Sequence, residues 1–234
     1  MTLNCRTVSR VNTAIVIAVV ALAGSVVTAM VSTFGLPVIQ GRRDARKVLD
    51  TYRGPLVDAS YELQARLYNI LSLQFVDEYI KDSTQDKQAA AIHSTLYVFA
   101  QFFGSRELIR AEIQYLRFSR HQRTRRVSQL VWEIGEEFLA NSYGPQFMLW
   151  RVEQRGLGER MITATNGRAA CLGYAAFVEQ RDTMDEWLKP LEKDLENLDD
   201  GGRRRLTRIQ HLLLELVREL DDEGRRYPFT MNEA

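Results

Sequence analysis

The stretch Ala14–Val31, with the sequence AIVIAVVALAGSVVTAMV, is an uninterrupted run of small and apolar residues near the start of the chain. It lies inside residues 11–41, which contain no Asp, Glu, Lys or Arg. A helix that crosses a bilayer needs about 20 mostly apolar residues, so this segment is long enough for one crossing and too short for two. We therefore predict a transmembrane helix over residues 11–39, preceded by a short tail of residues 1–10.

A cleaved signal peptide is the alternative interpretation of the same run. Ala21-Leu22-Ala23 has the small-residue pattern of a cleavage site. The apolar stretch continues past Ala23 to Ile39, however, so cleavage would leave the product with a hydrophobic N-terminus. The length of the run therefore favours an uncleaved anchor.

The basic residues on either side of the run predict the orientation of the anchor. Five basic residues follow the apolar run closely, and two basic residues precede it. Because basic residues favour the cytoplasmic side, we expect the N-terminus outside and the rest of the chain in the cytoplasm, at the plasma membrane. They are Arg6 and Arg10 before the run, and Arg42, Arg43, Arg46, Lys47 and Arg53 after it.

Small residues recur along the anchor at spacings of three or four: Ala14, Ala18, Ala21, Ser25, then Thr28 or Ala29, and Ser32. Such a stripe lets two helix backbones approach closely in a bilayer, so it predicts a homodimer that forms through the anchor. The alternative is that alanine and serine are simply common in membrane helices.

After the anchor, the apolar spacing is that of helices almost throughout. We predict an all-α fold: a basic juxtamembrane helix or linker over residues 40–55, a bundle-like helical domain over 56–222, and a flexible tail over 223–234. Gly54-Pro55 is expected to end the basic helix, with Pro55 in the first turn of the next helix.

Two segments carry the clearest apolar stripes, residues 125–141 and residues 203–220. Each stripe should face the core of the bundle. The stripes are Val127, Leu130, Val131, Ile134 and Phe138 in the first segment, and Leu206, Ile209, Leu213, Leu216, Val217 and Leu220 in the second.

Glycine-containing pairs and triplets mark further expected boundaries. Gly104-Ser105 is expected to end a helix over residues 87–103, with Ser105 capping the next helix. Thr165-Asn166-Gly167 marks a turn, after which a helical pattern resumes over residues 169–197. Interruptions of that last pattern are expected near Arg181 and Pro190.

A polar stripe of Asp58, Glu62, Arg66 and Asn69 runs along the helix that follows Pro55. Glu62 and Arg66 stand in the favourable order for an ion pair one helical turn apart. We expect this stripe to be a solvated face.

Composition excludes several classes of function. Lys and Arg number 31 and Asp and Glu number 30, so the chain lacks the basic excess of a nucleic-acid-binding protein. Its two cysteines, Cys5 and Cys171, do not form a disulfide framework. The three histidines stand in no metal-binding motif. We therefore predict no metal, no cofactor and no nucleic-acid partner.

The most unusual local composition lies in residues 151–160, where arginines surround two glycines. A glycine-rich backbone beside arginine side chains is suited to binding phosphate, which would fit an enzyme that acts on a phosphate-bearing or lipid substrate. The alternative is a tight helix junction held by ion pairs with the interleaved glutamates. The candidate anion-binding residues are Arg151, Arg155, Gly156, Gly158 and Arg160.

A second cluster of arginines occurs between two expected helices, in a stretch without acidic residues. Lys and Arg near an anionic leaflet bind its head groups, so we predict that this cluster lies at the membrane surface and contacts anionic lipid. The alternative is internal pairing with the acidic run of residues 185–200. The candidate membrane-surface residues are Arg117, Arg120, Arg123, Arg125 and Arg126.

Three stretches of the domain resemble an uncharacterised bacterial family of single-pass, membrane-anchored helical proteins. They are LQARLYNI at residues 63–70, STLY at 94–97 and WRVEQRGLGE at 150–159. The resemblance implies a location and an all-helical shape, and it implies no activity.

These features together predict a membrane-tethered helical module for protein interaction or scaffolding at the cytoplasmic face. The partners expected are the lipid bilayer and an unidentified protein. The runner-up is the enzyme described above, with residues 151–160 as its anion site.

The predicted orientation can be checked by labelling cysteines in whole cells. In a chain with Cys5 and Cys171 replaced by serine, we expect Ser83→Cys to resist a membrane-impermeant thiol reagent, because residue 83 should face the cytoplasm. Labelling of position 83 before lysis would reverse the orientation, and a mature N-terminus at Gly24 would remove the anchor.

Overall fold

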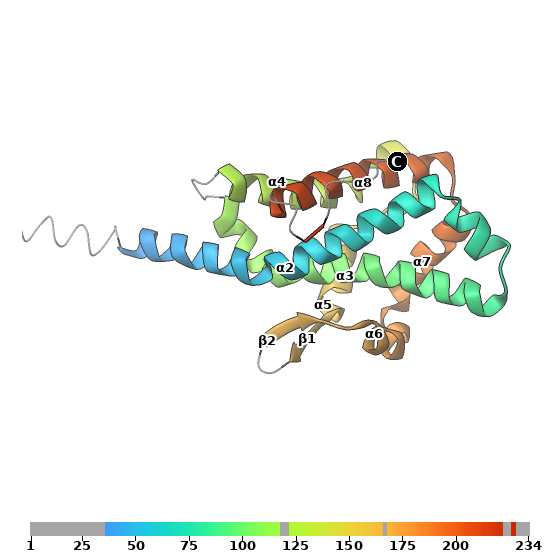
Figure 1. The fold of residues 1–234 in the computed structure, drawn as a ribbon, viewed down its shortest axis with the longest axis horizontal. Coiled ribbons are helices and arrows are strands. Elements are labelled where there is room, and N and C mark those ends of the chain that lie inside the picture. The colour runs from blue at the N-terminus through green and yellow to red at the C-terminus, as the bar shows by residue number, and fades with distance from the viewer. Residues whose placement is uncertain (1–35, 118–121, 166–167, 222–225, 228–234) are drawn as a thin grey trace, which may run out of the picture. The chain divides into compact units, whose positions relative to one another are not determined.

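Helices form most of the computed structural model, which describes residues 36–117, 122–165, 168–221 and 226–227 (Figure 1). The helices are α2 (Leu36–Ser72), α3 (Gln85–Arg117), α4 (Gln122–Glu137), α5 (Arg151–Arg160), α6 (Tyr174–Gln180), α7 (Asp185–Glu196) and α8 (Asp200–Leu220). Shorter elements are the π-helix η2 (Asp77–Lys81), the 3-10 helices η3 (Asn141–Tyr143) and η4 (Arg181–Met184), and the strands β1 (Ile162–Thr165) and β2 (Arg168–Cys171).

The chain divides into two units, Met1–Lys47 and Val48–Ala234. Of the first unit, the structure describes only the beginning of α2. Within the described part of the chain, no helix combines the length and the apolar character needed to cross a bilayer. The predicted transmembrane helix lies outside these residues except for its last four positions, 36–39, so the anchor stays a prediction.

The core of the second unit confirms the two predicted stripes. Along α4, Val127, Leu130, Val131 and Ile134 are at most 1% exposed, and Phe138 just beyond the helix is fully buried. The stripe of α8 is buried to the same degree, and the two helices lie side by side (Figure 1). Each fully buried aliphatic side chain contributes about 1.5–3 kcal/mol, so this seam is a main source of stability.

Helix α2 continues through Gly54 and Pro55, where we predicted a break. A proline inside a helix costs about 3 kcal/mol, because it removes a backbone hydrogen bond and crowds the preceding turn. Contacts beside the proline offset this cost. Leu56 and Val57 are buried, and the hydroxyl of Ser105 in α3 donates to the Pro55 carbonyl at 3.4 Å.

Helix α3 also continues through its expected end at Gly104. A Cβ at this position would lie 2.7 Å from the Cβ of Met161 and 2.9 Å from the Sγ of Cys171. The glycine therefore allows close packing and does not end the helix. Ser105 lies buried in the middle of α3 and caps no second helix.

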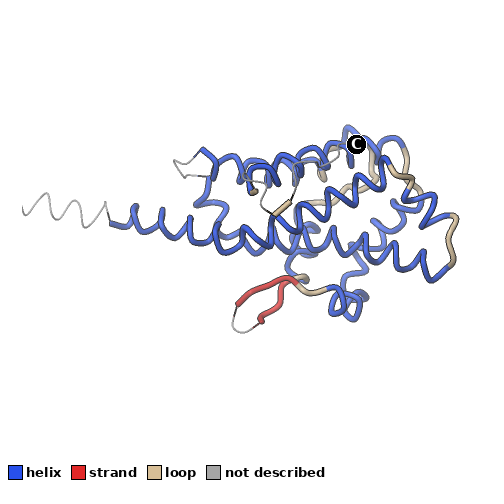
Figure 2. Tube along the Cα trace, in the orientation of Figure 1, coloured by secondary structure: helices blue, strands red, loops and turns tan. Residues whose placement is uncertain are grey.

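A β-hairpin replaces part of the expected helix over residues 169–197 (Figure 2), while the rest of the described chain is mostly helical, as the all-α prediction expected. β1 and β2 pair antiparallel, with Ile162 opposite Cys171. The amide of Leu172 extends the pairing by donating to the Met161 carbonyl at 2.7 Å. Asn-Gly, the sequence between the two strands, is a frequent hairpin pair that we had interpreted only as a turn.

Of the two helix interruptions predicted after the hairpin, the structure contains one. η4 separates α6 from α7 at Arg181, as expected. The interruption expected at Pro190 is wrong, because Pro190 lies inside α7. The stripe Leu188, Leu191 and Leu195 is at most 1% exposed, and this packing carries the helix through the proline.

Arg205 of α8 is the largest fully buried side chain among the described residues. Its guanidinium donates to the carbonyls of Glu137 at 2.6 Å, Ala140 at 2.9 Å and Gly144 at 2.7 Å. The last carbonyls of a helix lack partners inside the helix. Arg205 therefore supplies donors to the end of α4 and to the loop that follows, and ties both to α8.

We expect Arg205→Met to lower the free energy of unfolding by about 3 kcal/mol or more, because it removes three hydrogen bonds from a charged donor, and such bonds contribute about 1.5–3 kcal/mol each. Urea unfolding of the full chain in mild detergent measures this loss. Arg204→Met is the matched control, because Arg204 is exposed. It should change stability by less than about 0.5 kcal/mol, and equal losses in both variants would contradict the role of Arg205.

Candidate functional site

Residues 151–160, predicted as a glycine-rich anion-binding turn, form the helix α5. A Cβ at Gly156 would lie 2.9 Å from the Cζ2 of Trp187, and a Cβ at Gly158 would lie 2.7 Å from the carbonyl oxygen of Phe103. Both glycines therefore allow neighbouring elements to approach α5. The segment is therefore a closely packed helix, as the interpretation of a tight helix junction expects.

The three arginines of α5 do not converge on one point. Arg151 is paired with Glu136 of α4, and Arg155 is paired with Glu159 at 2.7 Å and lies 4.0 Å from Glu107. At about 100° per residue, Arg160 projects from the side of the helix opposite to Arg151. An anion at this segment would compete with the glutamates for two of the arginines, and anion binding here stays a prediction.

Gln154 joins three helices behind the Arg151–Glu136 pair. It is 3% exposed, and its side-chain amide donates to the carbonyls of Gly135 at 3.0 Å and Leu149 at 2.8 Å. Its side-chain oxygen accepts a hydrogen bond from the guanidinium of Arg106 in α3. Burial lowers the pKa of Arg106. These three hydrogen bonds of Gln154 fix the start of α5 against α3 and α4.

Large apolar side chains are exposed around this junction. Trp132 is 40% exposed, Trp150 is 57% exposed and Val152 is 76% exposed. Trp132 lies one helical turn before Glu136 in α4, and Trp150 and Val152 are the two chain neighbours of Arg151, so all three come from the helix ends and turns that the Arg151–Glu136 ion pair joins. We call these three residues the tryptophan surface. Two of the three tryptophans in the chain belong to it.

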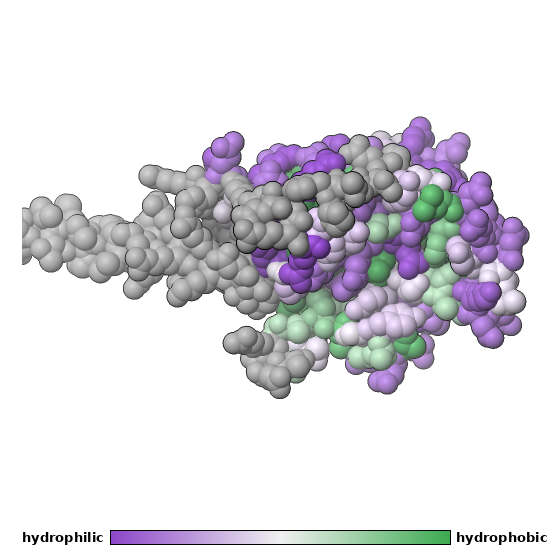
Figure 3. Space-filling view, in the orientation of Figure 1, coloured by the Kyte–Doolittle hydropathy of each residue, from purple (hydrophilic) through white to green (hydrophobic). Residues whose placement is uncertain are grey.

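Other exposed apolar side chains lie on α6. Tyr174 is 43% exposed and Val178 is 40% exposed, one helical turn apart. Figure 3 shows hydrophobic side chains near α6, among other hydrophobic patches on the same face. The ring of Tyr174 packs edge-on against Tyr97 of α3, with ring centroids 5.4 Å apart. This second surface is smaller and contains no tryptophan.

The structure describes four of the five arginines that we predicted at the membrane surface. Arg126 is paired with Glu215 of α8, and Arg125 is exposed. The acidic partner therefore comes from α8, whereas the alternative prediction named the run of residues 185–200. Arg117 ends α3, Arg123 lies in the first turn of α4, and Arg120 lies outside the described residues. Lipid contact stays a prediction.

The polar stripe of α2 differs from the predicted solvated face. Arg66 is only partly exposed, donates to the Thr95 hydroxyl of α3 at 3.1 Å, and lies 4.6 Å from the ring centroid of Phe75. Burial and the neighbouring charge of Asp58 raise the pKa of Glu62. Arg66 thus packs against α3 and Phe75, which its spacing from Glu62 did not indicate, whereas Glu62 is exposed as predicted.

Within the described ranges, no group of His, Cys, Asp and Glu side chains has the arrangement of a metal site. Cys171 is partly buried beside the Ser105 hydroxyl at 3.6 Å, and burial raises the pKa of its thiol. A thiol held protonated is a poor nucleophile, so this contact is one of packing.

Comparison of the chain with protein-family models, with curated proteins and with solved structures finds no match. The resemblance to a family of anchored bacterial proteins therefore stays a prediction.

We expect Gly158→Ala to lower the free energy of unfolding by about 1–2 kcal/mol. Contact of the new methyl group with the Phe103 backbone outweighs the gain of about 1 kcal/mol in helix propensity. Gly173→Ala is the matched control, because a Cβ there would meet no atom within 4 Å. Thermal unfolding compares the two, and a Gly158→Ala variant more stable than the unmodified chain would contradict the close contact of α5 with α3.

Proposed function

We propose that this protein is a membrane-tethered helical module that binds a protein partner at the cytoplasmic face. The apolar run at residues 14–31 would supply the tether, and the basic residues after it would place the domain inside the cell. The proposal for the domain itself rests on one observation, the exposure of Trp132, Trp150 and Val152 beside a single ion pair.

The chemistry of these residues fits a protein interface. A tryptophan buries about 150–250 Å² on contact, and tryptophan is enriched among the residues that dominate binding energy. The partly exposed Arg151–Glu136 pair beside these residues offers charged groups that can hydrogen bond to a partner. Interfaces commonly combine large apolar side chains with such polar contacts.

The contacts that hold α5 in place favour a tryptophan surface that is already formed before a partner binds. Gln154 holds the first turn of α5 to the carbonyls of Gly135 and Leu149, and Gly158 holds its last turn against α3. A surface that is rigid before binding loses less conformational entropy on binding. The same ion pairs disfavour the runner-up enzyme, because Arg151 and Arg155 would have to leave their glutamates to hold an anion.

The experiment compares partners captured by matched variants of the full chain from detergent-solubilised membranes, with quantification by mass spectrometry. We expect Trp132→Ser with Trp150→Ser to deplete specific partners about tenfold or more, which corresponds to about 1.4 kcal/mol of binding energy. Tyr174→Ser with Val178→Ser removes apolar surface from α6 and should retain the same partners.

Both double variants change exposed positions, so thermal unfolding should stay close to that of the unmodified chain. Partners that bind the tryptophan variant as well as the unmodified chain would rule out the tryptophan surface. Depletion of the same proteins by both variants would also do so.

A further inference from the structure

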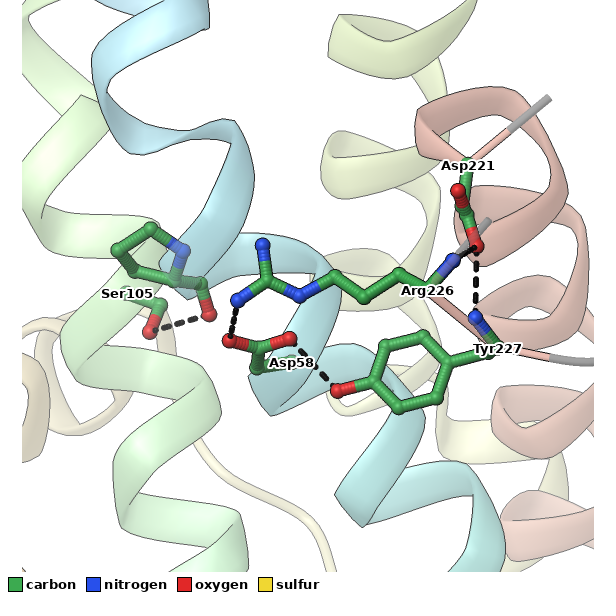
Figure 4. A network of polar contacts seen from close by, with 6 residues as sticks. Asp58, Ser105, Asp221, Arg226 and Tyr227 are labelled. Carbon is green, nitrogen blue, oxygen red and sulfur yellow. Dashed lines mark hydrogen bonds and ion pairs between the residues drawn. The ribbon is translucent and has the colours of Figure 1, made fainter. Parts of the chain in front are cut away.

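Two residues near the C-terminus pack against α2, far from the tryptophan surface in sequence. The hydroxyl of Tyr227 donates to Oδ1 of Asp58 at 2.6 Å, and the guanidinium of Arg226 donates to Oδ2 of the same carboxylate at 2.6 Å (Figure 4). Both oxygens of Asp58 are therefore used by the pair. The sequence predicted a flexible tail over residues 223–234, and of that range the structure describes only these two residues.

The ring of Tyr227 and the guanidinium of Arg226 each pack against a residue of α2. The ring of Tyr227 stacks on the ring of Tyr61, with centroids 3.8 Å apart and planes within 14°. A Cβ at Gly54 would lie 3.1 Å from Nη1 of Arg226, so the guanidinium rests on a helix surface that has no side chain. Glycine thus leaves room for the arginine one turn before Asp58.

The backbone of the pair is held by one carboxylate at the end of α8. Oδ2 of Asp221 accepts hydrogen bonds from the amides of Arg226 at 3.0 Å and Tyr227 at 2.9 Å (Figure 4). Both bonds are made by backbone amides of the pair, so they do not depend on its side chains.

The charges of α2 also fit a cationic, aromatic occupant. Asp58 and Glu62 stand one helical turn apart, and Asp58 is 29% exposed in its pair with Arg226. Without the arginine, two carboxylates would face each other beside the Tyr61 ring. Burial and the bond to Asp58 raise the pKa of Tyr227, so its hydroxyl keeps the proton that it donates.

We propose that Gly54, Asp58, Tyr61 and Asp221 form a recognition site for an arginine–tyrosine pair in a peptide segment of a protein partner, and that Arg226 and Tyr227 of this chain occupy the site in cis. We call these four residues the clasp site. A partner that carries the same pair displaces the tail and binds α2 in its place. Because Arg226 and Tyr227 are tethered to α8 by a few residues, their effective concentration at the clasp site is in the millimolar range. A free peptide has to compete with this tethered pair, so the intact chain should bind the peptide weakly.

The test uses the full chain in detergent and a fluorescein-labelled peptide of residues 224–230, GRRYPFT. Arg226→Gln with Tyr227→Ala empties the clasp site without shortening the chain. Fluorescence anisotropy should show the peptide binding the emptied chain at least tenfold more tightly than the intact chain. Equal binding to both chains, or no binding to the emptied chain, would overturn the proposal.

Two further variants of the emptied chain separate the site from general electrostatic attraction. Asp58→Asn should abolish peptide binding, because it removes the charge that pairs with the arginine. Asp82→Asn makes the same charge change at an exposed position outside the clasp site and should leave binding unchanged. Equal losses in both variants would mean non-specific attraction and would also overturn the proposal. Circular dichroism verifies that each variant keeps the helical content of the intact chain.

Discussion

The close approach of α5 to α3 is the constraint on which the candidate site depends. Gly158 of α5 lies against the backbone of Phe103, and Gly104 of α3 lies against Met161 just after α5. Each contact leaves no room for even a methyl group, so the two helices have one way to pack. The start of α5 is thereby brought to α4, where Arg151 meets Glu136, and the hairpin that follows α5 is brought to α3, where Cys171 meets Gly104.

Buried polar groups then decide which ends of the helices meet. Arg205 gives its donors to carbonyls at the end of α4, and Gln154 bonds to carbonyls on both sides of the α4–α5 connection. Between α8 and α2, the side-chain amide of Gln210 donates to the oxygen of Gln64 at 3.2 Å. A buried polar group without a partner costs about 1–3 kcal/mol, so alternative packings that separate these pairs are disfavoured. Apolar stripes can slide along one another, whereas these pairs specify one register.

Apolar periodicity in the sequence was enough to predict the helices that contribute a single face to the core. The stripes of α4 and α8 were correct at every position, because burial at 3.6-residue spacing is a local property of the sequence. Glycine and proline were interpreted as helix ends, and this failed at Pro55, Gly104 and Pro190. At each of these positions the residue is accommodated or required by another element, and such a contact is invisible to local propensity.

The sequence predicted only part of the candidate functional surfaces. Residues 151–160 were singled out by their composition, and they do lie at the candidate site. Arg155 pairs with Glu159 of the same segment, as the ion-pair alternative expected, but Arg151 pairs with Glu136, which comes from another helix. Exposure of Trp132 and Trp150 could not be predicted, because a tryptophan at a helical position is more often buried. The contact of Arg226 and Tyr227 with Asp58 joins residues about 170 positions apart. The local sequence pattern around either end does not predict such a long-range contact.

Amide hydrogen exchange across α5 tests the central claim, that a glycine-containing segment is a helix locked onto α3. Mass spectrometry of the full chain in mild detergent follows exchange in peptides that cover residues 156–161. A helix fixed at Gly158 predicts protection comparable to that of the buried helix α8, which opens only with large parts of the fold. Exchange within seconds, as in an exposed glycine-rich loop, would contradict the account and would return residues 151–160 to the anion-binding turn that the sequence first suggested.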